Sequence, residues 1–543
     1  MQLFTKSRFT FFAALLSLVA INQLWAQKKT LTRVYDPVIV TAAKLPALLT
    51  DTIKVFTAYR YSNGSFASVP FQIDEVNGDG QYLRESDTSV DANDEVVFMP
   101  GDTGERAPTD KWIEGSADSR FELETTDPMT NEKGWLYLFR RVKNPPKVTP
   151  HVRYSRGRVE VGADTVFATS YTEAHDDKGW FVDTRIRAPF GDNQDIMDRQ
   201  KVQVEGTIVF GIFRIPVSLN EANNVQYRYI RPGGGPVRVL REYGIKLVVS
   251  ASGFTYADSS ASFFTQYFPF NTSFAAQNLK LPPNLPATIN LVRQSVDLNE
   301  LAVNMRFFNA YNLSGIIVNG QPDSPIKTIN DPPDGLNWSM ITGDQGTILT
   351  LLSVPLLGTK RELYFNDNST PNNDDTGDKK SYGDAGISIS SPALGSSFSF
   401  EFSTYYLEKN QAAATGEQFK QRALKPLLVT AAKQTRTISA VQSETTAPLE
   451  FKLYDAQPNP FTPQLGQVRI SFGLGATNIT PSLRIFNLLG QEVARFAGVD
   501  LRRSNTVLWD GRDQLGRAVP AGVYFYQLEA GRQRAVKKLM LVR

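Results

Sequence analysis

Apolar and polar residues alternate along much of the chain in short runs. Such runs include IKVFTAYRY, GWLYLFRRV, KVQVEGTIVF and SFSFEFSTYY. They are rich in β-branched and aromatic side chains, which suit a pleated sheet, and Gly, Asn, Asp and Pro between them suit tight turns. The pattern therefore predicts a mainly β protein built from several antiparallel β-sandwiches.

Two stretches interrupt this pattern. Residues 408–424 predict a helix, and the polar residues 434–450 that follow are typical of a linker. A chain of 543 residues has room for about three domains of ordinary size. The expected parts are an N-terminal β domain with acidic loops at 27–150, a large β-sandwich domain at 151–410, a helix and linker at 411–450, and an immunoglobulin-like domain at 451–543.

One short sequence occurs twice. VTAAK appears within VIVTAAKLP at 38–46 and within LLVTAAKQT at 427–435. Five identical residues of common strand-forming types favour chance, or a shared role as edge strands, over a duplicated unit.

The N-terminus predicts export. Two basic residues, Lys6 and Arg8, precede an apolar run at 9–21, and Ala26 ends the segment. The run is shorter than the roughly 20 residues that a membrane-spanning helix needs, so residues 1–26 are typical of a secretory signal peptide. We expect the Sec route to the periplasm, no transmembrane segment in the mature chain, and a secreted or cell-surface location.

Composition excludes several classes of function. The chain has no cysteine, which excludes disulfides, thiolate nucleophiles and cysteine-ligated metals. A net charge of +3 and two histidines favour neither a nucleic-acid-binding surface nor a multi-histidine metal site. We therefore expect no nucleic-acid partner.

Residues 451–543 contain five sequence elements in a fixed order. These are PNPF, IFNLLGQEV, WDGRDQLGR, PAGVYFYQL and the terminal KKLMLVR. Pro458 and Pro460 restrict the backbone angle φ, so we expect Phe461 to be a fixed plug at the bottom of a small sandwich. Together the elements resemble the C-terminal sorting domain of type IX secretion cargo, whose immunoglobulin-like fold also occurs in flagellar hook-cap proteins. Thr462 departs from the Asn that is more usual after Phe.

The resemblance implies that this domain directs the folded protein from the periplasm through an outer-membrane translocon, so the outer-membrane secretion machinery is the expected partner. The implied sorting residues are Asn459, Pro460, Phe461, Gly490, Trp509, Asp510, Gly511, Gly522, Lys537 and Lys538. Lys537 and Lys538 either form a solvated edge that prevents strand addition or contact the translocon. Nearer the N-terminus, VPFQIDE and DANDEVVFM are similar only to uncharacterised exported bacterial proteins, which implies no activity.

The first concentration of acidic residues lies at 74–95, where eight carboxylates face one basic residue, Arg84. Their mutual repulsion needs a cation or hydrogen bonds to relieve it. Glu75, Asn77 and Asp79 alternate and precede a glycine, as oxygen ligands do in a calcium loop. The match is imperfect, because Ser86 stands where a bidentate Glu belongs. The segment is either a calcium site or an exposed acidic hairpin, and the hairpin is favoured.

The second concentration lies at 364–390, between two strand-like runs. Asp367, Asp374, Asp375, Asp378 and Asp384 occur there among Asn and Gly, and the first four are the expected ligands. Carboxylate oxygens suit calcium, but Asp and Asn also accept hydrogen bonds from turn backbone. Calcium is therefore the one cofactor that the sequence predicts, at either acidic segment.

Catalytic motifs are scarce. The sequence contains no serine-hydrolase elbow, zinc-protease motif or phosphate loop. His175, followed by two aspartates, could be an oriented base, although a solvated turn is favoured. Trp112, Trp135, Trp180 and Trp338 permit sugar stacking, although a core role is favoured.

Two functions remain open at this point. The first is an exported surface or secreted protein with a binding or structural role, on glycans if its aromatic residues are exposed. The second is a secreted polysaccharide lyase or glycoside hydrolase, because carboxylate pairs are set by the fold and not by sequence spacing. Polysaccharide is the ligand expected in both cases, and the sequence leaves the presence of catalysis open.

Overall fold

The computed structural model describes residues 27–49, 51–83, 89–156, 164–176, 179–251, 254–280, 287–327, 329, 335–353, 360–395, 397–436, 451–463, 466–474, 481–497 and 506–542. It divides into two compact units, Met1–Thr437 and Ile438–Arg543, which are described separately. The named strand pairs are antiparallel, and the architecture is multi-domain and mainly β, as the alternating pattern predicts. The predicted signal peptide at 1–26 lies outside the described residues.

The first unit begins with a small two-sheet sandwich. One sheet has the order β1 (Val38–Thr41), β5 (Glu95–Phe98), β4 (Gln72–Asp74). The other has the order β26 (Leu428–Thr435), β6 (Ser119–Thr126), β7 (Lys133–Arg140), β2 (Phe56–Ser62), β3 (Ser65–Ser68). Alternate residues of both sheets, among them Val40, Phe98, Phe121 and Leu138, are buried in one core.

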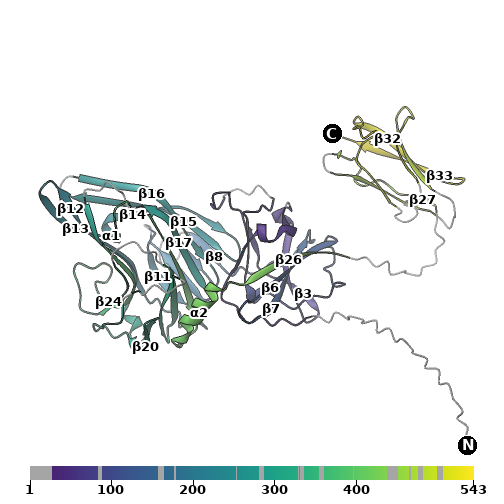
Figure 1. Ribbon diagram of the computed structural model, residues 1–543. Coiled ribbons are helices and arrows are strands. Elements are labelled where there is room, and N and C mark those ends of the chain that lie inside the picture. The colour runs from purple at the N-terminus through teal and green to yellow at the C-terminus, as the bar shows by residue number, and fades with distance from the viewer. Residues whose placement is uncertain are drawn as a thin grey trace, which may run out of the picture. The chain divides into compact units, whose positions relative to one another are not determined.

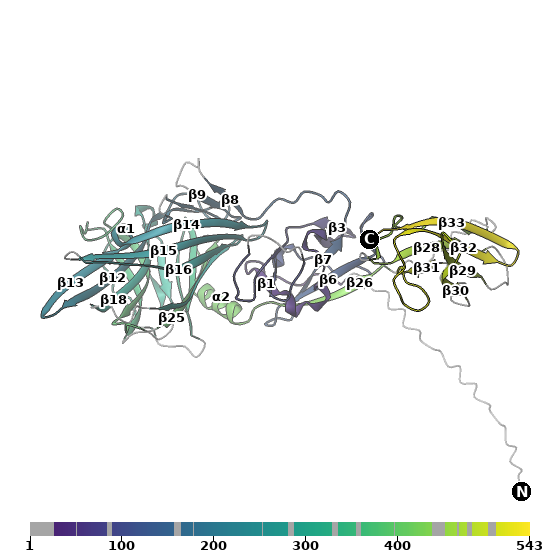
Figure 2. The same cartoon turned by 90° about the horizontal axis from the view of Figure 1, so that it is seen from above.

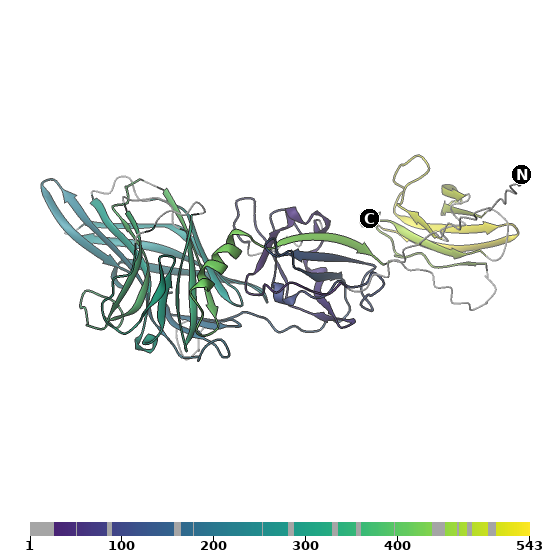
Figure 3. The same ribbon diagram turned by 60° about the horizontal axis from the view of Figure 1, so that its bottom comes forward.

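The predicted linker at 434–450 begins two residues too early, because β26 extends to Thr435. Residues 428–435 pair with β6 in the N-terminal sheet, where Figure 3 shows them as a green arrow along purple strands. Val429 and Ala431 pack against the core, and the Gln434 side chain hydrogen-bonds Arg120 and Glu122. The polar side chains of this strand face solvent or satisfy buried charges, so composition alone does not reveal the strand. The rest of the predicted linker lies outside the described residues.

The two VTAAK sequences adopt different structures. The first runs from the end of β1 into a short 3-10 helix at Ala42–Lys44, whereas the second lies wholly within β26. Both β1 and β26 are edge strands, but the five residues do not form the same element twice.

Three further sheets form the larger part of the first unit (Figure 1). The nine-stranded sheet has the order β14 (Val225–Gly234), β15 (Val239–Ala251), β16 (Phe254–Tyr267), β17 (Asn271–Lys280), β25 (Ser397–Leu407), β22 (Gly346–Ser353), β21 (Leu336–Gly343), β19 (Arg306–Asn309), β20 (Asn312–Ile317). The five-stranded sheet has the order β13 (Phe213–Asn220), β12 (Met197–Phe210), β18 (Ala287–Leu298), β24 (Ser381–Ser390), β23 (Lys360–Asn368). The four-stranded sheet has the order β11 (Phe181–Ile186), β10 (Tyr171–His175), β9 (Asp164–Phe167), β8 (Arg153–Arg156). Figure 2 shows β12, β13 and β18 extending together at one end of this unit.

Two α-helices are described, the single-turn α1 (Glu221–Asn224) and α2 (Ala414–Leu424). The predicted helix at 408–424 starts later than expected, because Asn410 has a φ of 55°, which is incompatible with a right-handed helix. Phe419 of α2 packs on the nine-stranded sheet against Trp338 and Tyr405. Gly416 permits this approach, because a Cβ atom there would lie 2.3 Å from the Trp338 ring. None of the described helices is long and apolar enough to cross a membrane.

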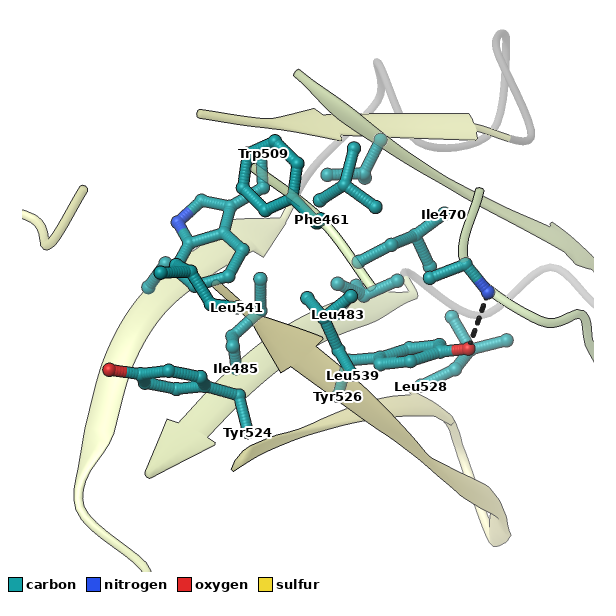
Figure 4. Packing of buried hydrophobic residues seen from close by; sticks show 14 of the residues in the cluster. Phe461, Ile470, Leu483, Ile485, Trp509, Tyr524, Tyr526, Leu528, Leu539 and Leu541 are labelled. Carbon is teal, nitrogen blue, oxygen red and sulfur yellow. Dashed lines mark hydrogen bonds between the residues drawn. The ribbon is translucent and has the colours of Figure 1, made fainter. Parts of the chain in front are cut away.

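The C-terminal unit is a two-sheet sandwich with its own core. One sheet has the order β27 (Lys452–Leu453), β28 (Val468–Gly473), β31 (Thr506–Trp509). The other has the order β30 (Glu492–Ala497), β29 (Ser482–Asn487), β32 (Gly522–Ala530), β33 (Gln533–Leu541). Figure 4 shows the buried side chains that lie between the two sheets.

Candidate functional site

The PNPF segment is fastened to the last strand of the C-terminal unit. The Asn459 side chain donates to the Lys538 carbonyl at 3.1 Å and accepts from the Met540 amide at 2.9 Å. The Phe461 amide donates to the Met540 carbonyl, and the Val542 amide donates to the Phe461 carbonyl. Both peptide bonds before Pro458 and Pro460 are cis. The entrance of the domain and its end are therefore held together by four hydrogen bonds.

Phe461 and Trp509 fill the same part of the core (Figure 4). Phe461 is 1% exposed, and its ring centroid lies 6.2 Å from that of Trp509. The Trp509 indole donates to the Arg512 carbonyl at 2.8 Å, and the Asp510 side chain accepts from the Arg512 amide. At Gly511 φ is 80°, and a Cβ would lie 2.9 Å from Pro463. Phe461, Trp509, Asp510 and Gly511 of the expected sorting set therefore belong to one packed cluster.

The other expected sorting residues lie at turns and on strands. Gly490 has a φ of 76° in the turn between β29 and β30, and Gly522 begins β32. Lys537 forms a 2.6 Å ion pair with Asp455, while Lys538 is exposed on β33 at the edge of its sheet. Lys538 therefore suits either role that the sequence leaves open.

Three exposed leucines of the C-terminal unit are not evident from the sequence. Leu488 and Leu489 stand at the β29–β30 turn, 67% and 83% exposed, and Leu515 is 74% exposed in the next described loop. Gln514 donates to Glu492 and to the Val493 carbonyl, so this loop lies against the start of β30. Exposed apolar side chains on neighbouring loops are typical of a contact surface. Single leucines or leucine pairs give no sequence signal, because turns tolerate both apolar and polar residues.

Two carboxylates of the first acidic segment are paired with an arginine from the larger part of the unit. Arg238, with none of its side chain exposed, forms ion pairs with Asp74 at 2.5 Å and Glu95 at 2.7 Å. Asn77 closes a turn, because its side-chain oxygen accepts from the Asp79 and Gln81 amides. Glu75, Asn77 and Asp79 therefore lie on a hairpin turn. Ser86 lies outside the described residues.

The four aspartates expected to bind calcium in the second segment are separated in the structure. Asp367 is buried and accepts hydrogen bonds from the Asn319, Gly320 and Gly383 amides. It therefore holds two backbone segments together. Asp374 is exposed. The remaining two, Asp375 and Asp378, contact residues of β12.

Asp378 belongs to the acidic group that could hold a cation. Its ligand atom and those of Asp198 and Asp297 all lie within 4.8 Å of one another. Burial, followed by repulsion from Asp378, raises the pKa of Asp198 to about 6. No sequence signal unites these three residues, because they come from β12, β18 and the loop before β24.

Lys201 is the cation already present beside this group. Its ammonium lies 2.6 Å from Asp297 and 2.9 Å from Asp375. Burial opposes its charge, but Asp297 and Asp384 outweigh that effect and raise the pKa of Lys201. Burial raises the pKa of Asp384, neither of whose carboxylate oxygens has a well-aligned hydrogen-bond partner among the described residues. The cluster therefore carries more carboxylates than Lys201 alone can neutralise.

His175 lies in a buried polar network, so the favoured interpretation as a solvated turn is wrong. It ends β10 with its side chain inaccessible, its Nδ1 2.8 Å from Asp164 and its Nε2 3.0 Å from the Tyr267 hydroxyl. Burial, and then the charge of Arg241, lower the pKa of His175 to about 4. The imidazole is therefore neutral near pH 7. Its partners come from distant strands, which the sequence alone does not bring together.

A cavity of about 410 Å³ lies beside this network, between the nine-stranded and five-stranded sheets. One wall is formed by β22 and β25. Their register pairs Ile348 with Tyr406, Thr350 with Thr404, and Leu352 with Phe402. The opposite wall includes Val292, Gln294 and Val296 of β18. Glu173 of β10 lines the cavity, and the Tyr406 hydroxyl donates to it at 3.3 Å. Most of the lining is aliphatic or aromatic.

The four tryptophans considered for sugar stacking are not open platforms. Trp135, Trp180 and Trp338 are buried, so the core interpretation is confirmed for them. Trp112 is half-buried, with Arg120 and Arg436 over its ring at 4.7 Å and 5.1 Å.

The fold defines a multi-domain antiparallel β-sandwich protein with a separate C-terminal immunoglobulin-like unit. No protein-family model matches the chain, and no curated protein matches it.

Three solved structures show remote similarity. PorZ, an essential surface component of the type IX secretion system of Porphyromonas gingivalis, is 10% identical over 75% of this chain and 73% of its own, with a TM-score of 0.14. Dimeric latent PorU from Porphyromonas gingivalis is 6% identical over 80% and 47%, with a TM-score of 0.15. The ectodomain of the C. elegans fusion protein EFF-1 is 8% identical over 78% and 86%, with a TM-score of 0.12. At these values the similarities carry no inference about this chain.

Proposed function

We propose that this protein is an exported binding protein of the cell surface or medium, and that its C-terminal unit directs export by type IX secretion. The observation that carries the proposal is a separate C-terminal unit with its own core, whose PNPF segment is fixed to its last strand. The sequence resemblance supplies the secretion route, and the exposed leucines supply a surface for the machinery. The cavity of the first unit supports a binding role.

Deletion of residues 451–543 tests the sorting role. The first unit has its own cores, so it should stay folded after the deletion. We expect the truncated protein to accumulate in the periplasm, as measured by cell fractionation and immunoblotting. Surface or medium levels equal to those of the full chain would refute the sorting role.

Leu489→Asp separates recognition from folding. This side chain is 83% exposed, so the substitution should leave the melting temperature unchanged and reduce export. The matched control is Ile212→Asp, because Ile212 is 91% exposed at the β12–β13 turn of the first unit. Export of both variants at the wild-type level would exclude the leucine turn as a contact.

We also propose a structural calcium ion at Asp198, Asp297 and Asp378. Three carboxylates and the poorly partnered Asp384 suit a hard cation. A cation that binds only the folded state stabilises it by about 2.7 kcal/mol at a hundredfold excess over the dissociation constant. Chelation should lower the melting temperature of the wild type but not of Asp378→Asn, with Asp374→Asn as the control that keeps the sensitivity. Superimposable wild-type melts with chelator and with calcium would contradict the proposal.

A polysaccharide lyase or glycoside hydrolase needs carboxylates in an open, polar cleft. The cavity of about 410 Å³ is mainly apolar, so it does not support either enzyme. A smaller pocket of the first unit is lined by Asp74, Glu75 and Glu242, and it is the feature of the described residues that suits the enzyme as second candidate.

A further inference from the structure

The cavity of the first unit has the size and lining of a ligand site. Its volume of about 410 Å³ lies within the usual range for small-molecule pockets, roughly 300–1,000 Å³. Val296, near the end of the central strand β18, is 37% exposed although its neighbours Ser295 and Asp297 are buried. An apolar side chain that lines a cavity and remains accessible indicates that solvent or a ligand reaches it.

The cavity is lined along β25 from Tyr406 to Phe402. From Tyr406 to Phe402 the β25 wall spans about 13 Å, at roughly 3.3 Å per residue. One end holds Glu173 and the Tyr406 hydroxyl. Thr350 and Thr404 form the middle one of the three residue pairs, and their hydroxyl oxygens are 3.2 Å apart. The far end of this wall is formed by Leu352 and Phe402, and Arg293 and Gln294 of β18 are among the polar residues that also line the cavity.

We propose that this cavity binds a long-chain fatty acid, with its carboxyl head at Glu173 and Tyr406 and its hydrocarbon chain between β18 and β22–β25. An unbranched chain can lie along the β25 wall in this mainly apolar space, and burying its methylene groups supplies the binding free energy. This inference rests on the proposed binding function and names the ligand class. A sugar would leave most of its hydroxyl groups without partners against the aliphatic wall.

The state of Glu173 supports this orientation. Burial raises the pKa of Glu173 to about 8, while the Tyr406 hydroxyl and Arg241 oppose the shift and Asp164 adds to it. A carboxyl that keeps its proton near pH 7 can donate a hydrogen bond to an oxygen of the head group. His175, neutral at that pH, lies 3.9 Å from the Glu173 carboxyl, and Tyr171 stacks on Tyr406.

Binding is tested on the purified full chain without residues 1–26. The probe is parinaric acid, whose fluorescence rises in apolar surroundings, and palmitic acid is the competitor. Ala385→Phe and Val296→Trp place larger side chains in the cavity and should weaken probe binding at least about tenfold. The matched control is Ser388→Phe, because Ser388 is three residues after Ala385 on β24 and is therefore on the other face. It should bind as the wild type does.

A second measurement needs no larger side chain in the cavity. Trp180 lines the cavity, so a bromine-labelled fatty acid should quench its fluorescence. The quenching should fall when Trp180 is replaced by Phe. This measurement tests fatty-acid binding in the cavity even if both cavity-filling variants fail to fold.

Absence of saturable probe binding by the folded wild type would overturn the fatty-acid assignment. So would wild-type affinity in the folded filling variants, or quenching that Trp180→Phe leaves unchanged. Displacement of the probe by a rigid polycyclic lipid but not by palmitic acid would also overturn it. All of these measurements use purified protein, so they are independent of the export experiments.

Discussion

Replacing Glu173 with Gln should change how the stability of the first unit depends on pH. Glu173 is fully buried, and its pKa is raised from 4.5 to about 8, chiefly by burial. Between these two values the folded state keeps a proton that the unfolded state releases. The free energy of unfolding therefore falls as pH rises, by about 1.4 kcal/mol per pH unit from this group. Above pH 8 the slope from Glu173 vanishes.

His175 has the opposite effect at lower pH. Burial and Arg241 lower its pKa from 6.5 to about 4, so in this range the unfolded state holds the extra proton. Its contribution to stability rises with pH between these values and is constant above 6.5. Between pH 4.5 and 6.5 the contributions of Glu173 and His175 to the pH dependence of the unfolding free energy cancel. Between pH 6.5 and 8 only that of Glu173 remains, and over 1.5 pH units it removes about 2 kcal/mol.

The assay is urea unfolding of the full chain, followed by tryptophan fluorescence, for the wild type and Glu173→Gln from pH 6.5 to 8.5. Gln cannot titrate, so the stability difference between the two proteins should change by about 2 kcal/mol up to pH 8 and then level off. Tyr406→Phe is the control, because it removes the hydrogen bond to Glu173 but keeps the titrating carboxyl. A stability difference that is constant across this range would refute the buried, protonated state of Glu173.

Three other substitutions test the packing that positions the sites. Phe461→Ala should destabilise the C-terminal unit by about 3–5 kcal/mol, because a buried ring is lost, and circular dichroism melting of residues 451–543 measures it. Arg238→Ala should cost the first unit about 3 kcal/mol, because Asp74 and Glu95 lose their shared counterion; restored stability in Arg238→Lys would indicate that charge alone suffices. Gly416→Ala should cost about 1–3 kcal/mol through overpacking against Trp338, and an unchanged melting temperature would contradict the close helix–sheet contact.

The sequence predicts the strands well, because their period of two is a local property. The C-terminal sandwich is also predictable, since its turns and prolines lie close together in sequence. The start of α2 is not, because it depends on the backbone of Asn410. Strand β26 lies between a helix and a polar linker, and only its pairing with β6 shows that it belongs to the N-terminal sheet.

The candidate sites depend on contacts between distant residues, which explains why the sequence does not reveal them. Arg238 lies far along the chain from Asp74, and Asp198 lies far from Asp378, yet each pair is in contact or nearly so. A run of carboxylates indicates that counterions are needed but not which groups supply them. The cavity has no sequence signature, because its walls are ordinary alternating strands.

The five-stranded sheet lies between the proposed fatty-acid site and the proposed calcium site, because its side chains point to both faces. Along β18, Ser295 and Val296 both line the cavity, while the next residue, Asp297, is buried on the acidic side with its carboxylate 2.6 Å from the Lys201 ammonium. Successive residues of a strand point to opposite faces. A substitution at 296 therefore enters the fatty-acid site without entering the cation cluster, and one at 297 does the reverse. If Val296→Trp weakens fatty-acid binding but keeps the response to chelator, the two sites are independent although only one layer of backbone lies between them.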